Sequence, residues 1–386
     1  MIPYGRQSID EADIKAVTDV LRSDFLTQGP QVPIFEAAVA AQVGAAHAVA
    51  ANSATSALHI ACMALGLGPD DWLWTVPITF VASANVGLYC GARVDFVDID
   101  AHTLTMCPTA LEAKLAWAAD RGCLPKVLIP VHLTGRSCDM ARIHALAQRY
   151  GVAVIEDASH AIGADYQGAP VGDCRFCDIT VFSFHPVKII TTAEGGMACT
   201  QDAGLAQAME LARSHGVTRD PAIMQGPVDG AWSYQQVALG YNYRMTDLQA
   251  ALGVAQMQKL EHFIQRRRDL AQWYHTALAD LPLSCPALPD DASSAWHLYV
   301  VQLDLDQISR PKADLFEALR GRGIGVNLHY IPVHLQPYYR ALGFKPGDFP
   351  VSEAYYERAL TLPLHPQLTD DELNTVVTVL TEEVRA

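Results

Sequence analysis

The chain has 386 residues, 50% of them apolar, so it can bury a large core, and its length favours one large domain with a smaller companion. Its net charge of −15 is spread along the chain, which argues against nucleic acid and anionic membrane surfaces as partners. The apolar stretches are interrupted by charge, Gly or Pro, and the first residues lack the layout of a signal peptide. We therefore expect a soluble, cytoplasmic protein.

The cysteines fit reduced thiols better than a disulfide framework, because nine of them, an odd number, are scattered from Cys62 to Cys285. Cys174 and Cys177 form a C-x-x-C motif, which can begin a zinc or redox site. No second C-x-x-C or H-x-x-x-H follows, so ordinary thiols are the better interpretation. We predict no metal.

The first predicted element is a helix. Residues 8–11, Ser-Ile-Asp-Glu, have the form of a capping box, and apolar residues follow at helical spacing: Ile14, Val17, Val20 and Leu21. Apolar strand-like runs then alternate with amphipathic helices, at residues 72–76, 94–97, 126–132, 152–155 and 179–184. This alternation predicts an α/β fold with a mainly parallel sheet flanked by helices.

The sequence pattern changes after a long helical pattern at residues 247–264. Pro-rich loops, short strands at 297–303 and 325–329 and further helices follow, and the last helix begins at a capping box, Thr369 to Glu372. We therefore predict a large domain of residues 1–255 and a smaller C-terminal domain of residues 256–386.

Residues 52–58 are small and polar and lead into a helix with an apolar face. Such a helix start offers unpaired backbone N–H groups, and small side chains allow a phosphate to approach closely. Ordinary capping by Ser53 or Thr55 is the alternative interpretation.

Glu156 and Asp157 follow the apolar strand predicted at 152–155. A carboxylate at the C-terminal end of a parallel strand lies where open sheets bind ligands, and it can hold a proton on a ring nitrogen. A helix N-cap is the alternative for a single Asp at this position.

Lys188 lies just beyond the apolar run of residues 179–184. Partial burial favours the neutral amine that forms a Schiff base, as pyridoxal phosphate (PLP) requires, whereas an arbitrary strand-end lysine is usually solvated.

The small polar helix start comes first in the chain, then the Asp at a predicted strand end, then the Lys at the next one, and this is the order found in fold-type I PLP enzymes. The chain resembles the DegT/DnrJ/EryC1/StrS sugar aminotransferase family over nearly its full length. The resemblance implies a fold-type I transferase, with a mainly parallel central sheet and a smaller C-terminal α+β domain. It rests on seven separated segments: residues 26–29, 52–58, 77–82, 156–161, 183–196, 240–246 and 329–332.

The resemblance implies two catalytic residues. Lys188 is the Schiff-base lysine and then the general base and acid, and Asp157 pairs with the pyridine nitrogen. Asn242 is expected to arrive from a second subunit, which implies a homodimer with shared active sites. The implied cofactor-binding set is Ala54, Thr55, Phe80, Asp157, His160, Ser183, Lys188 and Asn242.

For a sugar nucleotide, the resemblance implies contacts from the N-terminus and two loops: Tyr4, Asp24, Phe25, Leu26, Thr27, Gln28, Asn327, Leu328, His329 and Tyr330. Phe80 is the candidate for stacking on the cofactor ring, and His160 for supporting Asp157 or the ring. Both have ordinary alternatives, a core phenylalanine and a satisfied polar histidine.

Residues 185–188 and 191–196 are most similar to the subgroup of pseudaminic acid biosynthesis. That subgroup implies amination of a UDP-4-keto-6-deoxy-N-acetylhexosamine, UDP-2-acetamido-2,6-dideoxy-β-L-arabino-hex-4-ulose, at C4, with L-glutamate as amino donor. Many members carry Gly where this chain has Ala193, so we expect that the backbone there does not need a positive φ.

Three alternatives stay open. The substrate can be another nucleotide-linked 4-keto-6-deoxy sugar, because sister enzymes share these motifs. A sugar dehydratase of the same fold replaces the lysine by His, and Lys188 argues against it. A catalytically inactive regulator on this fold is disfavoured because Lys188 and Asp157 are both present.

Overall fold

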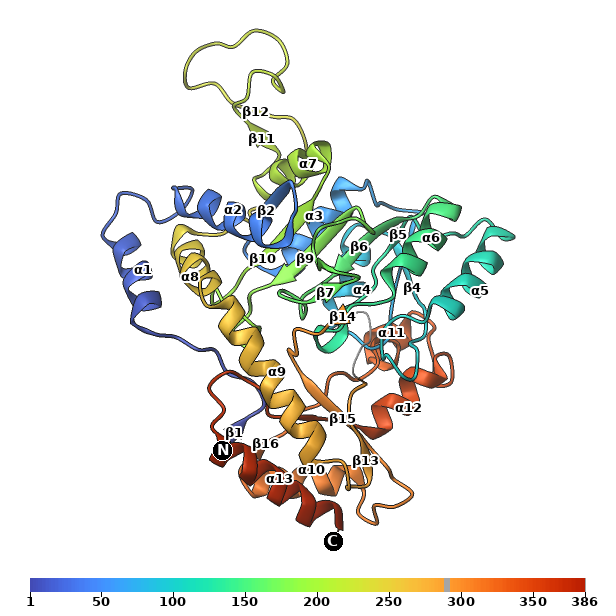
Figure 1. The fold of residues 1–386 in the computed structure, drawn as a ribbon. Helices are drawn as coiled ribbons and strands as arrows, with labels where there is room; N and C mark the ends of the chain where they lie inside the picture. The colour runs from blue at the N-terminus through green and yellow to red at the C-terminus, as the bar shows by residue number, and fades with distance from the viewer. Residues whose placement is uncertain (288–291, 386) are drawn as a thin grey trace.

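The computed structural model describes residues 1–287 and 292–385, and a seven-stranded sheet lies at its centre (Figure 1). Only β10 runs antiparallel to its two neighbours, so the predicted mainly parallel sheet is confirmed. The strands in spatial order are β2 (His47–Ala51), β10 (Gly196–Thr200), β9 (Ile179–Ser183), β6 (Ala153–Asp157), β5 (Val127–Leu128), β3 (Trp72–Thr75) and β4 (Arg93–Phe96).

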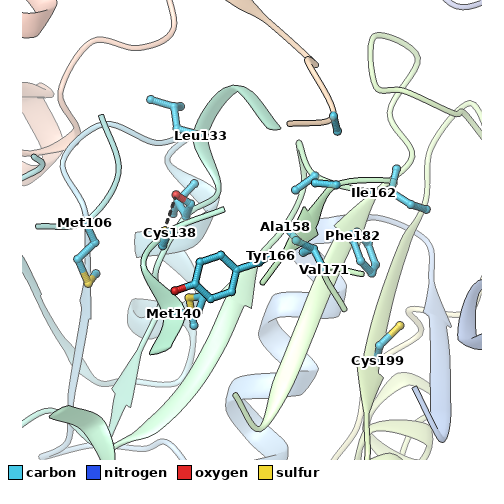
Figure 2. Packing of buried hydrophobic residues seen from close by; sticks show 14 of the residues in the cluster. Met106, Leu133, Cys138, Met140, Ala158, Ile162, Tyr166, Val171, Phe182 and Cys199 are labelled. Carbon is cyan, nitrogen blue, oxygen red and sulfur yellow. Dashed lines mark hydrogen bonds between the residues drawn. The ribbon is translucent and has the colours of Figure 1, made fainter. Parts of the chain in front are cut away.

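Helices cover both faces of this sheet. One buried cluster takes side chains from α3 (Ala54–Ala64), α4 (Ala82–Tyr89) and α7 (Ala203–Arg213), and the cluster on the other face takes them from α2 (Gln31–Val43), α5 (Pro108–Ala119) and α6 (Met140–Tyr150). Figure 2 shows part of the second cluster, including Met140, Phe182 and Cys199. Because both faces are covered, central strands such as β9 are buried at every position.

The C-terminal part is built on a small antiparallel sheet beside the long helix α9 (Leu260–Ala277), which the lower half of Figure 1 shows. Three strands form this sheet: β13 (Leu283–Ser284), β15 (Tyr299–Leu303) and β17 (Ala359–Leu362). The helices of this part are α10 (Lys312–Gly321), α11 (Pro337–Ala341), α12 (Pro350–Arg358) and α13 (Asp370–Arg385). The first turns of α9 pack beside the central sheet and its last turns in the C-terminal core.

The N-terminus lies on the C-terminal part, because β1 (Ile2–Pro3) pairs in parallel with β16 (Ile324–Gly325). The chain then crosses to α1 (Glu11–Leu21), which packs on α8 (Asp247–Met257). The division into residues 1–255 and 256–386 remains a prediction.

Smaller elements decorate this framework. A hairpin of β11 (Val217–Thr218) and β12 (Gln235–Gln236) carries a long loop that projects from the body of the molecule (Figure 1). Strands β7 (Asp165–Tyr166), β8 (Ala169–Pro170) and β14 (Ala292–Ser293) form a separate small sheet. Two 3-10 turns lie at Leu133–Gly135 and Val333–Leu335.

The helix caps partly differ from the sequence prediction. At α1 the predicted cap, Ser8, is wrong: Asp10 accepts the N–H groups of Ala12 and Asp13 at 3.0 and 3.1 Å, and its own N–H donates to Asp13. Because one carboxylate oxygen accepts two N–H groups of the first turn, Asp10 is a strong N-cap. At α13 the predicted capping box is confirmed, because Thr369 and Glu372 bond each other's backbone N–H.

The helical pattern of residues 247–264 forms two helices, α8 and α9, instead of one. The break falls at Gln258 and Lys259, where the Lys259 ammonium binds the carboxylates of Asp10 and Asp13 on α1. A pattern of apolar spacing continues through such a turn, so the sequence alone predicts a single helix.

Candidate active site

A cavity of about 510 Å³ opens where β6 and β9 end, and it gathers most of the predicted site residues. The carboxyl ends of parallel strands meet at one edge of a sheet, which brings the last residues of these strands, Asp157 and Ser183, together. The predicted residues that line this cavity are Tyr4, Ala54, Thr55, Phe80, Asp157, His160, Ser183, Lys188, Asn327, Leu328, His329 and Tyr330.

Two predicted parts of the site do not line this cavity. Residues 24–28 are exposed beside α8, where Thr27 forms a bridge with Thr246. Asn242 lies next to the start of α3, and its carbonyl accepts the Asn52 side-chain amide at 3.5 Å. Within one chain, neither segment reaches the interior of the cavity described above.

The start of α3 forms one wall of the cavity. Ser53 is the N-cap, and its Oγ accepts the Ser56 N–H at 3.1 Å, so Ala54 and Thr55 are the first helical residues. The backbone N–H groups of a first helical turn have no intrahelical acceptor, and together with the helix dipole they favour an anion. The predicted helix start is confirmed, with Ser53 as its cap.

Gly196 on β10 allows α3 to lie this close to the sheet. A Cβ atom at this position would lie 2.6 Å from the Ala54 N and Cα atoms. Real Cβ atoms do not approach backbone atoms so closely, so only glycine fits here.

Asp157 is buried, and both oxygens of its carboxylate are held by donors. Ser83 Oγ donates to Oδ2 at 2.6 Å, and Ser159 donates to Oδ1 from its backbone N–H at 3.1 Å and its hydroxyl at 2.6 Å. Sequence reasoning missed both serines. Ser159 follows Asp157 by two residues, a spacing typical of a local Asp turn, whereas Ser83 is 74 residues away and has no local signal.

Lys188 lies in the loop after β9, half-buried in the cavity. Burial lowers the pKa of its ammonium from 10.5 to about 8, although the nearby Asp157 carboxylate acts in the opposite direction. A lysine with this pKa reaches its neutral, nucleophilic form more readily than a solvated one.

The expectation for Ala193 is wrong, because its φ is 65°, in the left-handed region. Its N–H donates to the Thr191 hydroxyl at 3.0 Å, and the Thr192 hydroxyl donates to the Glu194 carbonyl at 2.8 Å. These bonds form a tight turn between Lys188 and β10 that requires the positive φ, even though the residue carries a Cβ atom.

His160 supports Tyr330 by a hydrogen bond. Its Nδ1 accepts the Thr134 N–H at 3.3 Å, so a neutral ring carries its hydrogen on Nε2, which lies 3.3 Å from the Tyr330 oxygen. Burial, together with Lys188 and His329, places the pKa of His160 well below its ordinary value. Its ring also lies 4.4 Å from that of His297, a cavity residue that sequence reasoning missed.

Phe80 is not a core residue, because 59% of its surface is exposed and it lines the cavity. Its ring centroid lies 6.3 Å from that of Tyr330. Two further rings line the same cavity, and the centroids of Tyr4 and His329 lie 5.1 Å apart. An aromatic face is therefore available to a flat ligand.

These features together fit PLP. The start of α3 suits a phosphate, Asp157 suits a protonated ring nitrogen, Phe80 suits a ring face, and Lys188 offers an amine, all within one cavity. A sheet of this topology with an amine, a carboxylate and an anion-binding helix start at one edge indicates a PLP-dependent enzyme of fold type I.

Comparison with known proteins shows the family. The family model described as the DegT/DnrJ/EryC1/StrS aminotransferase family matches residues 7–381, and the chain belongs to this family. Its members use PLP, and a solved relative, a putative sugar aminotransferase from Streptococcus pneumoniae, is known in a PLP form.

Several relatives match along their full length. The spore coat polysaccharide biosynthesis protein SpsC of Bacillus subtilis is 40% identical, with 100% of this chain and 97% of SpsC covered. The putative sugar aminotransferase Spr1654 of Streptococcus pneumoniae is 31% identical with a TM-score of 0.91, covering 100% of this chain and 99% of its own. Helicobacter pylori PseC, an aminotransferase involved in the biosynthesis of pseudoaminic acid, is 30% identical with a TM-score of 0.90, covering 99% of both chains.

Two further observations concern features predicted from the sequence. Cys174 and Cys177 both contact the Thr180 hydroxyl, at 3.4 and 3.2 Å, and residues 1–287 and 292–385 contain no cluster of three or more potential metal ligands. Among the helices in the described part of the chain, none has the length and apolar character needed to cross a membrane.

Proposed function

We propose that this aminotransferase transfers the amino group of L-glutamate to C4 of UDP-2-acetamido-2,6-dideoxy-β-L-arabino-hex-4-ulose in pseudaminic acid biosynthesis. The observation that carries the amino-transfer chemistry is the placement of Lys188, Asp157 and the start of α3 around one cavity. PseC supports the sugar, because it is described as an enzyme of pseudoaminic acid biosynthesis. The similarity of residues 185–188 and 191–196 to that subgroup supports it as well.

In this proposal, residues from α3, β6, β9 and the loop before α4 hold the cofactor. Ala54 and Thr55 bind the phosphate through the N–H groups at the start of α3, and the buried Ser183 hydroxyl assists them. Asp157 binds the ring nitrogen, and Phe80 covers one ring face. When bound, PLP supplies an electron sink for the bond-breaking at the carbon that carries the amino group.

Lys188 performs the proton transfers. Its Nζ would hold the cofactor, and the freed amine would act as general base and then general acid, taking a proton from the substrate carbon and releasing it where the reaction requires one. With a pKa of about 8, the amine exists in both the protonated and the neutral form near neutral pH. The histidines around it do not compete as acids, because burial and the Lys188 charge hold the pKa values of His160 and His297 well below the ordinary value.

The sugar nucleotide is bound on the side of Tyr4 and residues 327–330, which line the opening between the central sheet and the C-terminal part. Burial raises the pKa of the Tyr330 hydroxyl, which stays protonated and able to donate to a sugar oxygen. Residues 24–28 do not reach the cavity of their own chain, so they serve a substrate only if a second copy brings them there.

A homodimer accounts for two exposed apolar regions. In the projecting arm of β11 and β12, Trp232 and Tyr234 expose 74% and 61% of their surface. Near α1, Phe25 and Leu26 expose 53% and 49%. Apolar patches of this kind mark interaction surfaces, and a second copy would also present its Asn242 and residues 24–28 to the neighbouring cavity.

The test is an assay of purified enzyme with a panel of UDP- and dTDP-linked 4-keto-6-deoxy sugars and L-glutamate, followed by identification of the amino sugar. We expect the highest kcat/KM with the UDP-linked arabino-hexulose, and no product with the Lys188→Ala control. Turnover with a dTDP sugar alone would overturn the substrate. Absence of turnover with every sugar would favour the inactive regulator, and turnover by Lys188→Ala would overturn the mechanism.

A further inference from the structure

A chain of buried hydroxyl groups leads from the loop after β3 to Asp157. Ser83, on the first turn of α4, is fully buried and donates to Asp157 Oδ2 at 2.6 Å. Thr79, also buried, lies with its Oγ1 2.8 Å from the Ser83 Oγ. Both hydroxyls line the cavity that holds Lys188.

The direction of this chain is fixed by the number of hydrogens. A serine hydroxyl has one hydrogen, and the Asp157 carboxylate can only accept, so the Ser83 hydrogen goes to Oδ2. Thr79 must then donate to the Ser83 oxygen. Successive hydroxyls that donate in the same direction strengthen one another, and a bond to a carboxylate is stronger than one between neutral groups.

The two oxygens of Asp157 differ in their remaining capacity. Oδ1 accepts two hydrogen bonds from Ser159, whereas among the described residues Ser83 is the only one that donates to Oδ2. Each carboxylate oxygen offers about two acceptor positions, so Oδ1 is saturated and Oδ2 keeps one position open.

We propose that Ser83, held in turn by Thr79, is a positioning residue that orients the Asp157 carboxylate and leaves Oδ2 as the oxygen that accepts a hydrogen bond from the ring nitrogen of PLP. This inference rests on the role of Asp157 in the proposed function. The same segment presents Phe80 to the cavity, and the Ser83 N–H donates to the Phe80 carbonyl at 3.3 Å. Residues 79–83 therefore connect Phe80, which would cover the ring face, to Asp157, which would bind the ring nitrogen.

The test compares the affinity of the apoenzyme for PLP and for 1-deaza-PLP, in which a C–H group replaces the ring nitrogen. Both ligands carry the same aldehyde and phosphate, so Lys188 and α3 contribute equally, and the ratio of the two Kd values isolates the interaction at the nitrogen. Dissociation constants are measured by equilibrium dialysis for the wild type, Ser83→Ala, Ser83→Thr and Asp157→Asn.

We expect the wild type to prefer PLP and Asp157→Asn to lose most of that preference. Ser83→Ala should reduce the preference about tenfold, the size expected for one hydrogen bond to a charged group, and Ser83→Thr should restore part of it. In turnover, Ser83→Ala should lower kcat with little change in KM for glutamate. Thr75→Val is the matched control, because its buried hydroxyl donates to the Ile129 carbonyl and not to Asp157.

An unchanged ratio in folded Ser83→Ala would overturn the inference. If that variant does not fold, Thr79→Val removes the donor to Ser83, and an unchanged ratio there overturns it equally. An unchanged ratio in Asp157→Asn would instead remove Asp157 from the proposed function, so the two failures are distinguishable.

Discussion

The amine of Lys188 is subject to two opposing effects. Burial in the cavity disfavours the ammonium ion, whereas the Asp157 carboxylate favours it, and burial has the larger effect on the pKa. The result is an amine that is protonated below a pH of about 8 and increasingly neutral above it. The Asp157 carboxylate, which we propose binds the ring nitrogen, therefore also limits how far the pKa of the lysine can fall.

This balance predicts the pH dependence of cofactor attachment. The rate at which PLP attaches to the apoenzyme should rise with pH through a midpoint near 8, because only the neutral amine reacts. Asp157→Asn removes the charge that favours the ammonium, so its midpoint should shift to lower pH. Stopped-flow absorbance of the cofactor measures both rates, with Nα-acetyl-lysine as the solvated reference, and a midpoint at that reference's pKa in the wild type would contradict the prediction.

At the scale of elements, the proposed phosphate site depends on how closely α3 packs against β10. The backbone of Ala54 lies directly above Gly196, so the position of the helix start is set by the absence of a side chain there. The contact with Gly196 therefore fixes the position of every free N–H group in the first turn of α3, because the helix moves as one rigid element.

We expect Gly196→Ala to displace the start of α3. The added methyl group meets backbone atoms that cannot rotate away, so overpacking should cost about 1–3 kcal/mol of unfolding free energy. It should also weaken PLP binding about tenfold or more, since the N–H groups would no longer point at the same phosphate position. Chemical denaturation and dialysis measure the two effects.

Gly321→Ala is the matched control for this substitution. Gly321 ends α10, and a Cβ atom there would meet nothing within 4 Å. Replacing a helical glycine at an open position usually changes stability by less than about 1 kcal/mol. Equal losses of PLP affinity in both variants would show that the close contact at Gly196 has no special role.

At the scale of the whole molecule, residues from both the N-terminal and the C-terminal part of the chain line the cavity. β1 pairs with β16, which places Tyr4 beside residues 327–330 and joins the N-terminus to the C-terminal part. Asn242 and residues 24–28 remain outside this cavity, and the projecting arm remains exposed (Figure 1). This arrangement suits a site that is completed by a second copy of the chain.

Subunit mixing tests the shared site. Lys188→Ala and Asn242→Ala protomers, each impaired alone, are unfolded and refolded together, so that mixed dimers form. If Asn242 acts in the neighbouring subunit, each mixed dimer holds one intact site, and random pairing should restore about a quarter of the wild-type sites. If Asn242 acts within its own chain, every site carries a defect and mixing restores no activity; turnover and size-exclusion chromatography separate these outcomes.

The sequence alone determined the parallel sheet, the start of α3, and the placement of Asp157 at the end of β6 and of Lys188 in the segment after β9. These features depend on local signals: apolar runs of strand length, small polar residues before a helix, and charged residues at or shortly after the end of an apolar run. Such signals extend over a few residues and are independent of the rest of the chain. The family resemblance connected them to PLP chemistry.

Only the tertiary structure decided which distant residues complete the site. Ser83 and Asp157 are 74 residues apart, and β1 meets β16 across most of the chain. Their contacts arise from packing between elements, which no local pattern encodes. The same holds for the turn that gives Ala193 its positive φ and for residues 24–28, which interchain contacts would have to bring to a cavity. Local signals thus determined the chemistry available to this protein, and long-range packing decided how its groups are oriented.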